Sequence, residues 1–207
     1  RAWGFGAGVI AGDPSADHFG ISSSNADDNT LDTSVLVINK DGNVGIGVTP
    51  SAWDSDNTAL QLGTQTAITN FGSGGVNSIF GHNVYEDGAY KYIGVGLANM
   101  FLMSAGELNY KVAASVSAGN AITFATALAI DTAGAVTKPV QPAFLARASS
   151  DQSNLAINTD ITVIYGTEVF DQGADFTVST GDGQGGDGSN LRGLFTAPIT
   201  GKYHLDF

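Results

Sequence analysis

The side chains that could bind a metal are few, and their spacing matches no common metal site. The chain has three histidines, His18, His82 and His204, and no cysteine. No two histidines have the short separation that brings metal ligands together. The lack of cysteine excludes disulfide bonds and thiolate ligands. We therefore expect each histidine to be an ordinary loop or strand residue, and we predict no metal site.

Carboxylates that could hydrolyse a glycosidic bond are present by residue type only. Such cleavage needs two carboxyl groups at a fixed separation. No spacing along the chain selects a pair from the candidates, which are Glu86, Asp87, Glu107, Glu168 and Asp171. The segment 71–75 comes nearest to a Gly-x-Ser-x-Gly nucleophile motif but lacks its spacing, and it is interpreted as a turn. We predict no catalytic residue and expect that the protein is not an enzyme.

Two segments have the composition of a calcium-binding loop. Residues 39–43 lack the alternating acids and the distal Glu of an EF-hand, and therefore predict a tight turn. Residues 181–188 are a single copy of a Gly-Asp repeat and predict a flexible loop, with calcium binding left open. Gly45-Ile46-Gly47 is no dinucleotide fingerprint, because no helix is expected after it. We predict no cofactor.

Aromatic side chains are the remaining candidates for binding. They could stack on the sugars of a host glycan, but aromatic rings also fill the cores of glycine-rich β proteins. Core or interface packing is the favoured interpretation for each of Trp3, Trp53, Tyr85, Tyr90, Tyr92 and Tyr110.

Composition limits both the fold and the partners. The chain has 28 Gly among 207 residues, only 14% charged residues and a net charge of −12. Glycine is thus about twice as frequent as usual and charge is scarce, which predicts an all-β, turn-rich protein. Because the few basic residues are scattered, binding to nucleic acid or to an anionic membrane surface is disfavoured. No apolar run is long enough to predict membrane insertion.

The most informative stretch is a predicted hairpin at residues 35–50. The β-branched run 35–38 predicts a strand, and Asp41-Gly42 predicts the turn that follows. Val44, Ile46 and Val48 alternate with glycine, so we expect them on one face. Gly45 and Gly47 would then lie on the other face, where another backbone could approach closely.

The hairpin pattern occurs twice at a constant offset. Residues 36–50 align without a gap to residues 128–142, with Gly42 matching Gly134 and Pro50 matching Pro142. Between the copies we expect short strands at Ala59–Leu62, Ser78–Phe80, Tyr90–Val95, Asn99–Met103, Asn109–Val112 and Ile122–Thr126. The segment Leu108–Ser117 could be read as helix or strand, and strand is the interpretation we favour.

Outside this region further strands are expected near both ends of the chain. The apolar residues Trp3, Phe5, Val9 and Ile10 predict a first strand, and Phe19 and Ile21 predict a second. After residue 142 the predicted strands are Phe144–Arg147, Thr162–Ile164, Glu168–Phe170, Leu194–Phe195 and Tyr203–Phe207. Since the chain begins with Arg1 and ends inside an expected strand, we expect a longer protein.

Residues 36–50 resemble a motif common in tail fibre proteins of bacteriophages. Residues 83–136 also look like a module of such fibres, with markers at Tyr90-Lys91-Tyr92, Gly106, Ile122-Thr123-Phe124 and Leu128-Ala129-Ile130-Asp131. The second hairpin departs from the motif, because Thr137-Lys138-Pro139 replaces Gly-Ile-Gly. Close backbone packing is therefore not expected there.

A second resemblance is to the C1q/tumour-necrosis-factor-like domain. Pro142-Ala143-Phe144 is similar to its opening strand, and residues 195–207 are similar to its Phe-x-x-Pro-x-x-Gly-x-Tyr-x-x-x-Phe signature. The other strands of that jelly roll are missing from this sequence. We therefore expect residues 142–207 to form only a partial C1q-like jelly roll.

Together the resemblances imply an elongated homotrimeric fibre of a virion. They imply a first fibre module at 1–50, a second at 51–141 and the N-terminal part of a C1q-like domain at 142–207. The implied function is structural and receptor-binding: attachment of a phage tail to a host glycan or outer-membrane protein, alongside other tail or baseplate proteins. The alternatives are a secreted bacterial surface adhesin with a C1q-like head and a polysaccharide depolymerase.

Overall fold

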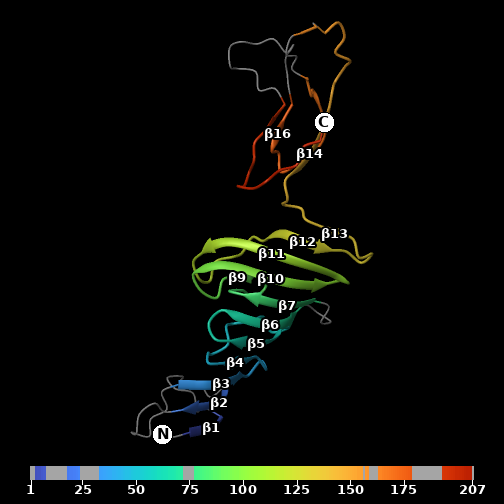
Figure 1. The fold of residues 1–207 in the computed structure, drawn as a ribbon. Helices are drawn as coiled ribbons and strands as arrows, with labels where there is room; N and C mark the ends of the chain where they lie inside the picture. Colours follow the sequence, from blue (N-terminus) through green and yellow to red (C-terminus); the bar gives the residue numbers. More distant parts are fainter. Residues whose placement is uncertain are drawn as a thin grey trace. The chain divides into compact units, whose positions relative to one another are not determined.

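The protein is all-β. The computed structural model describes residues 3–7, 18–23, 33–71, 77–155, 157–158, 163–178 and 193–206, and these contain no helix (Figure 1). The fold class predicted from the sequence is thereby confirmed. In the described ranges no helix is long and apolar enough to cross a membrane.

Contacts divide the chain into two compact units, residues 1–138 and residues 139–207. Unit 1 is built on an eleven-stranded sheet whose strands follow the order of the chain, from β1 to β7 and then from β10 to β13 (Figure 1). A small hairpin of β8 and β9 lies in the chain between β7 and β10 and forms a separate two-stranded sheet. The strands of unit 1 are β1 (Trp3–Ala7), β2 (His18–Ser23), β3 (Thr33–Asn39), β4 (Val44–Ile46), β5 (Thr58–Leu62), β6 (Thr66–Phe71), β7 (Asn77–His82), β8 (Tyr85–Glu86), β9 (Tyr90–Lys91), β10 (Gly96–Ser104), β11 (Glu107–Val116), β12 (Ala125–Ile130) and β13 (Val136–Thr137).

One pair in the sheet differs in direction from the others. β4 and β5 are parallel, whereas all the other neighbours in the large sheet are antiparallel. A parallel pair needs a connection that returns the chain to the same end, and residues 47–57 supply it. The boundary expected between the two fibre modules, at residues 50–51, falls inside this connection.

The two copies of the hairpin have the same turn. Asn39 Oδ1 accepts hydrogen bonds from the amides of Asp41 and Asn43, at 3.1 and 2.9 Å. Asp131 Oδ1 accepts the equivalent bonds from Ala133 and Ala135, at 2.9 and 2.8 Å. The φ angles of Gly42 and Gly134 are 83° and 82°, a left-handed conformation that glycine adopts without strain. The side-chain cap at the first turn position therefore fixes both hairpins.

The second strand of the first hairpin is shorter than the alternation over residues 44–48 predicts. β4 ends at Ile46 because Gly47 has a φ of 69°, so Val48 is not part of the strand. Gly45 does permit a close approach, but by the chain's own backbone: a Cβ there would collide with the carbonyl oxygen of Val48 and lie 2.9 Å from Cδ of Pro50. The second copy has Thr137 in place of Gly45, and β13 is a two-residue exposed strand.

One face of the large sheet is covered by the chain's own connections. Trp53 from the 47–57 connection packs on Ala59 and Ala67, with Tyr85 edge-on to the indole at 6.2 Å. A second cluster joins Ile79, Val84 and Met100, and its partly buried neighbours are Phe71, Tyr90, Leu102, Ile122 and Phe124. The core of unit 1 thus lies between this face and the segments that cross it.

Buried amide side chains attach the crossing segments to the sheet. Asn43 accepts a hydrogen bond from the Ala59 amide at 2.8 Å, and Gln61 accepts one from the Ser51 amide at 2.9 Å. Asn83 accepts one from the Gly94 amide at 2.7 Å and donates one to the Leu97 carbonyl at 3.1 Å. All three side chains are at most 1% exposed. Since an unsatisfied buried amide is costly, these bonds define where each segment crosses the sheet.

Unit 2 contains two small sheets and an aromatic cluster. β14 (Ala143–Arg147) pairs with β15 (Thr167–Gln172), and β16 (Phe176–Thr177) pairs with β17 (Leu194–Phe195). The Phe144 ring stacks on those of Phe176 and Phe195, with centroids 4.5 and 5.1 Å away. Asp171 at the end of β15 accepts hydrogen bonds from the amides of Asp175 and Phe176.

Several strand predictions need correction. Of the expected strand Tyr90–Val95 only Tyr90–Lys91 is extended, and the strand expected at Ile122–Thr126 begins at Ala125. β6 (Thr66–Phe71) was not expected at all, and Tyr203–Asp206 is not a strand. Leu108–Ser117 lies almost wholly in β11, so the strand interpretation is confirmed. Val9, Ile10, Thr162, residues 181–190 and Phe207 lie outside the described residues.

Candidate functional surface

A row of apolar side chains crosses the large sheet from strand to strand on the face opposite the core. The row joins residues that are direct cross-strand partners, one from each strand between β2 and β12. We call it the apolar ladder, and it consists of Phe19, Ile38, Val44, Leu60, Ile68, Phe80, Phe101, Tyr110 and Leu128. Directly opposed residues on a sheet face contact one another, so the ladder is a continuous apolar column.

Four residues of the ladder are about half exposed, although residues of these types are usually buried. Ile68 and Phe80 are 47% and 50% exposed, and Phe19 and Phe101 are each 43% exposed. Their chain neighbours Ala67, Ile79 and Met100 are at most 2% exposed, because side chains alternate between the faces of a strand. The two faces of one sheet therefore have different surroundings: the chain covers one and leaves the other open.

The positions on either side of the ladder carry no charged residue. One flanking row contains Ile21, Leu36, Ile46, Leu62, Thr66, His82 and Asn99. The other contains Thr58, Asn70, Ser78, Met103, Leu108, Ile130 and Val136. We call the ladder and these two rows the uncharged face, since none of the residues is Asp, Glu, Lys or Arg. In a chain of net charge −12, such a face is unusual for a surface that stays in water.

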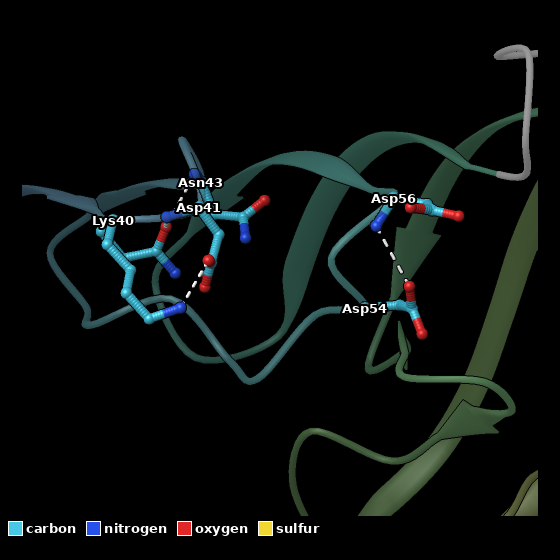
Figure 2. Close-up of polar contacts among 6 residues, drawn as sticks. Lys40, Asp41, Asn43, Asp54 and Asp56 are labelled. Atoms are coloured by element: carbon cyan, nitrogen blue, oxygen red, sulfur yellow. Dashed lines mark hydrogen bonds and ion pairs between the residues drawn. The ribbon is translucent and has the colours of Figure 1, made fainter.

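The charged residues that the structure describes in unit 1 lie in the turns and on the covered side. Figure 2 shows Lys40 and Asp41 in the turn after β3, and Asp54 and Asp56 in the connection before β5. Lys40 and Asp41 form an exposed ion pair at 2.6 Å, and Asp54 caps the Asp56 amide at 3.0 Å. These contacts are local and stabilise turns.

A second charged group surrounds the β8–β9 hairpin. Glu86 accepts hydrogen bonds from the Asn57 side chain at 2.6 Å and from the Gly88 amide at 2.7 Å. Asp87 pairs with Lys91 at 2.7 Å, and this hydrogen bond is the main reason that the pKa of Lys91 is raised. Burial, with a smaller contribution from the charge of Glu86, raises the pKa of Tyr90 to about 12. The carboxylates of Glu86 and Asp87 therefore stabilise the hairpin and its contact with Asn57.

The remaining residues considered for chemistry are dispersed. Glu107 begins β11 in unit 1, whereas Glu168 and Asp171 belong to β15 in unit 2. Among the histidines, His18 begins β2, His82 ends β7 on the uncharged face, and His204 lies in unit 2 beside Asp206 at 3.5 Å. In the described part of the chain, no three His, Asp or Glu side chains are grouped so that they could hold a metal ion.

The aromatic residues considered for sugar stacking lie mainly in the core. Trp53 is 6% exposed and Tyr92 is 2% exposed, which confirms core packing for both. Tyr85 packs on Trp53, and Tyr90 lies edge-on between Phe71 and Phe124, at 5.8 and 5.7 Å. Tyr110 packs against Phe101 on the apolar ladder at 5.0 Å. The side chain of Trp3 lies outside the described residues.

Unit 2 holds an open groove of about 700 Å³. Its walls include Phe144, Phe176, Phe195 and Tyr203, which are already in contact with one another. The groove is mainly apolar, and His204 and Asp206 also lie on its walls.

Comparisons with known proteins identify no relative. No protein-family model matches the chain, and neither a search of curated proteins nor a search of solved structures gave a match. The class of protein that the structure itself defines is an all-β protein with a meander sheet, one face of which is open and uncharged.

Proposed function

We propose that the chain is a structural segment of a homotrimeric fibre, most simply a bacteriophage tail fibre. The observation that carries this proposal is the uncharged face, which holds one ladder residue from each of nine strands and on which Phe19, Ile68, Phe80 and Phe101 are 43–50% exposed. Contiguous apolar patches of more than a few hundred Å² on soluble proteins mark interaction sites. A protein that is otherwise acidic would have such a face covered in its working state.

Self-association is the simplest way to cover this face. A sheet of this kind grows by one strand per hairpin and can be extended without enlarging a central core. Three such sheets facing one another would bury the apolar ladders on a common axis and leave the acidic turns in solvent. That arrangement supports a shaft function, in which length and stiffness matter more than a binding pocket.

In this proposal the protein attaches a virion to its host. Residues 1–138 would form part of the shaft, and residues 139–207 would belong to a C1q-like head that contacts a host glycan or outer-membrane protein. Three identical heads on one shaft gain avidity, so that each single contact can be weak. The motif at residues 36–50 and the signature at residues 195–207 support this assignment.

Immunogold electron microscopy would test the assignment to a virion. An antibody raised against residues 33–71, which include the hairpin motif, should label fibres on phage particles that carry this protein. Labelling of bacterial cell surfaces, without label on particles, would instead favour the secreted adhesin. Release of reducing ends from host capsule by the purified protein would favour the depolymerase.

A further inference from the structure

The apolar ladder also restricts how copies of the chain can meet. We infer that the copies associate parallel and in register, with their rotation axis running along the ladder, so that each ladder residue faces the same residue of the other copies. This inference rests on the proposed function for the number of copies, and adds the residues that meet and the direction of each chain.

The spacing of the ladder is the first argument. Its nine residues come from nine successive strands, which lie about 4.8 Å apart, so the column is about 38 Å long. A partner that covers the whole column must present apolar groups at the same interval. Another copy of this sheet does so at every strand, and few other surfaces would.

The order of side chains along the column is the second argument. The β3–β6 part of the ladder is aliphatic, with Ile38, Val44, Leu60 and Ile68, whereas β7 to β11 contribute aromatic rings. Rotation about an axis along the ladder brings each aliphatic level to an aliphatic level and each ring to a ring. The packing volume then matches at every level, as a close-packed interface requires.

The polar positions of the uncharged face give the third argument. Thr66, His82 and Asn99 are cross-strand partners on β6, β7 and β10. Rotation about the ladder brings this flanking row of one copy to the other flanking row of the next copy, strand by strand. Thr66 then meets Asn70 and His82 meets Ser78, so these polar side chains can share hydrogen bonds or water. A copy reversed about β6 would instead set His82 against Leu62. A polar group buried against an apolar one costs free energy, so the parallel arrangement is favoured.

Cysteine cross-linking tests this arrangement, because the chain has no cysteine of its own. Ile68→Cys places a thiol in the middle of the ladder, and Asp41→Cys places one in the exposed turn after β3. Disulfide formation requires Cβ atoms within about 4.5 Å, which is met only where identical residues face one another. We expect mild oxidation to convert the Ile68→Cys protein largely to covalent dimers and to leave the Asp41→Cys protein unlinked. A short bismaleimide should give the same difference.

Register is tested by mixing two variants. Ile38 and Ile68 are three strands apart on the ladder, a separation of about 14 Å. After co-refolding of Ile68→Cys with a larger, tagged Ile38→Cys chain, we expect homodimers of each and no mixed dimer. A predominance of mixed dimers would overturn the in-register arrangement.

Native mass, measured on the same samples, separates the two proposals. A mass of three chains without Ile68→Cys cross-links would overturn the arrangement and leave the trimeric fibre in place. A mass of one chain for the unsubstituted protein would overturn both.

Discussion

At the scale of single residues, Gly45 decides how the chain leaves the first hairpin. The backbone of Val48 and the ring of Pro50 pack against its Cα, so a methyl group has no space. We predict that Gly45→Ala lowers the free energy of unfolding by about 1–3 kcal/mol, the usual cost of overpacking. Urea denaturation followed by circular dichroism measures it.

The matched control for Gly45 is Thr137→Ala, at the equivalent position of the second hairpin. Thr137 is exposed, so its replacement should change stability by less than about 0.5 kcal/mol. Equal effects of the two substitutions would contradict the role assigned to Gly45.

Tyr90 provides a prediction about pH. Its pKa is raised to about 12, chiefly by burial and then by Glu86, whereas a tyrosine in the unfolded chain ionises near pH 10. Because the folded state holds the proton more tightly, the stability that this contributes is complete below pH 10 and is lost as the pH rises through 12. We predict that Tyr90→Phe, which keeps the ring between Phe71 and Phe124, reduces the loss of stability between pH 10 and 12. Urea midpoints at several pH values would show it, and identical alkaline profiles for both proteins would refute it.

At the scale of elements, Phe144 joins the two small sheets of unit 2. Its ring lies on β14 and stacks on the rings of Phe176 and Phe195 from β16 and β17. We predict that Phe144→Ala costs about 2–3 kcal/mol, somewhat below the cost at a fully buried site because Phe144 is half-buried. Hydrogen exchange should rise across residues 143–147 and 193–196 and stay unchanged in unit 1.

A neighbouring phenylalanine serves as the control for that substitution. Phe170 on β15 is 50% exposed and has no ring partner among the described residues. Phe170→Ala should have a much smaller effect, and a similar effect would mean that the aromatic stack does not hold unit 2 together.

The sequence predicted the all-β class and most strands, because their signals are local. Alternation, β-branched runs and Asp-Gly turns depend on neighbouring residues, and the repeated hairpin was visible from its spacing alone. β6 escaped prediction, although Gly63 lies in the turn before it, because Thr66–Phe71 mixes polar and apolar residues without regular alternation. Without β6, the pairing of Ile68 with Phe80 could not be inferred.

The uncharged face was also beyond sequence reasoning. The residues of its apolar ladder are separated by up to 109 residues along the chain, from Phe19 to Leu128, and only the strand register brings them into one row. The sequence signal that could have revealed it is the lack of charge at alternate positions of each strand. Trp53 covers the core face of the sheet because it lies in the connection between the parallel strands β4 and β5. No local sequence pattern predicts that these two strands are parallel.

At the scale of the whole molecule, a charge placed on the apolar ladder should prevent association without unfolding the chain. Phe80 points away from the core, so Phe80→Lys should leave circular dichroism unchanged while an unpaired buried ammonium disfavours assembly. We predict that the assembly dissociates to single chains. Thr123→Lys, at an exposed position in the segment before β12, is the control and should remain assembled. Retention of the assembly by Phe80→Lys would show that this face is not the interface.

The most direct measurement of the central proposal is the native mass of the unsubstituted 207-residue chain by light scattering with size-exclusion chromatography. The account predicts three times the chain mass of 21.1 kDa, independent of dilution across the micromolar range. A stable species of 21.1 kDa with native circular dichroism would contradict it, because the uncharged face would then remain in water.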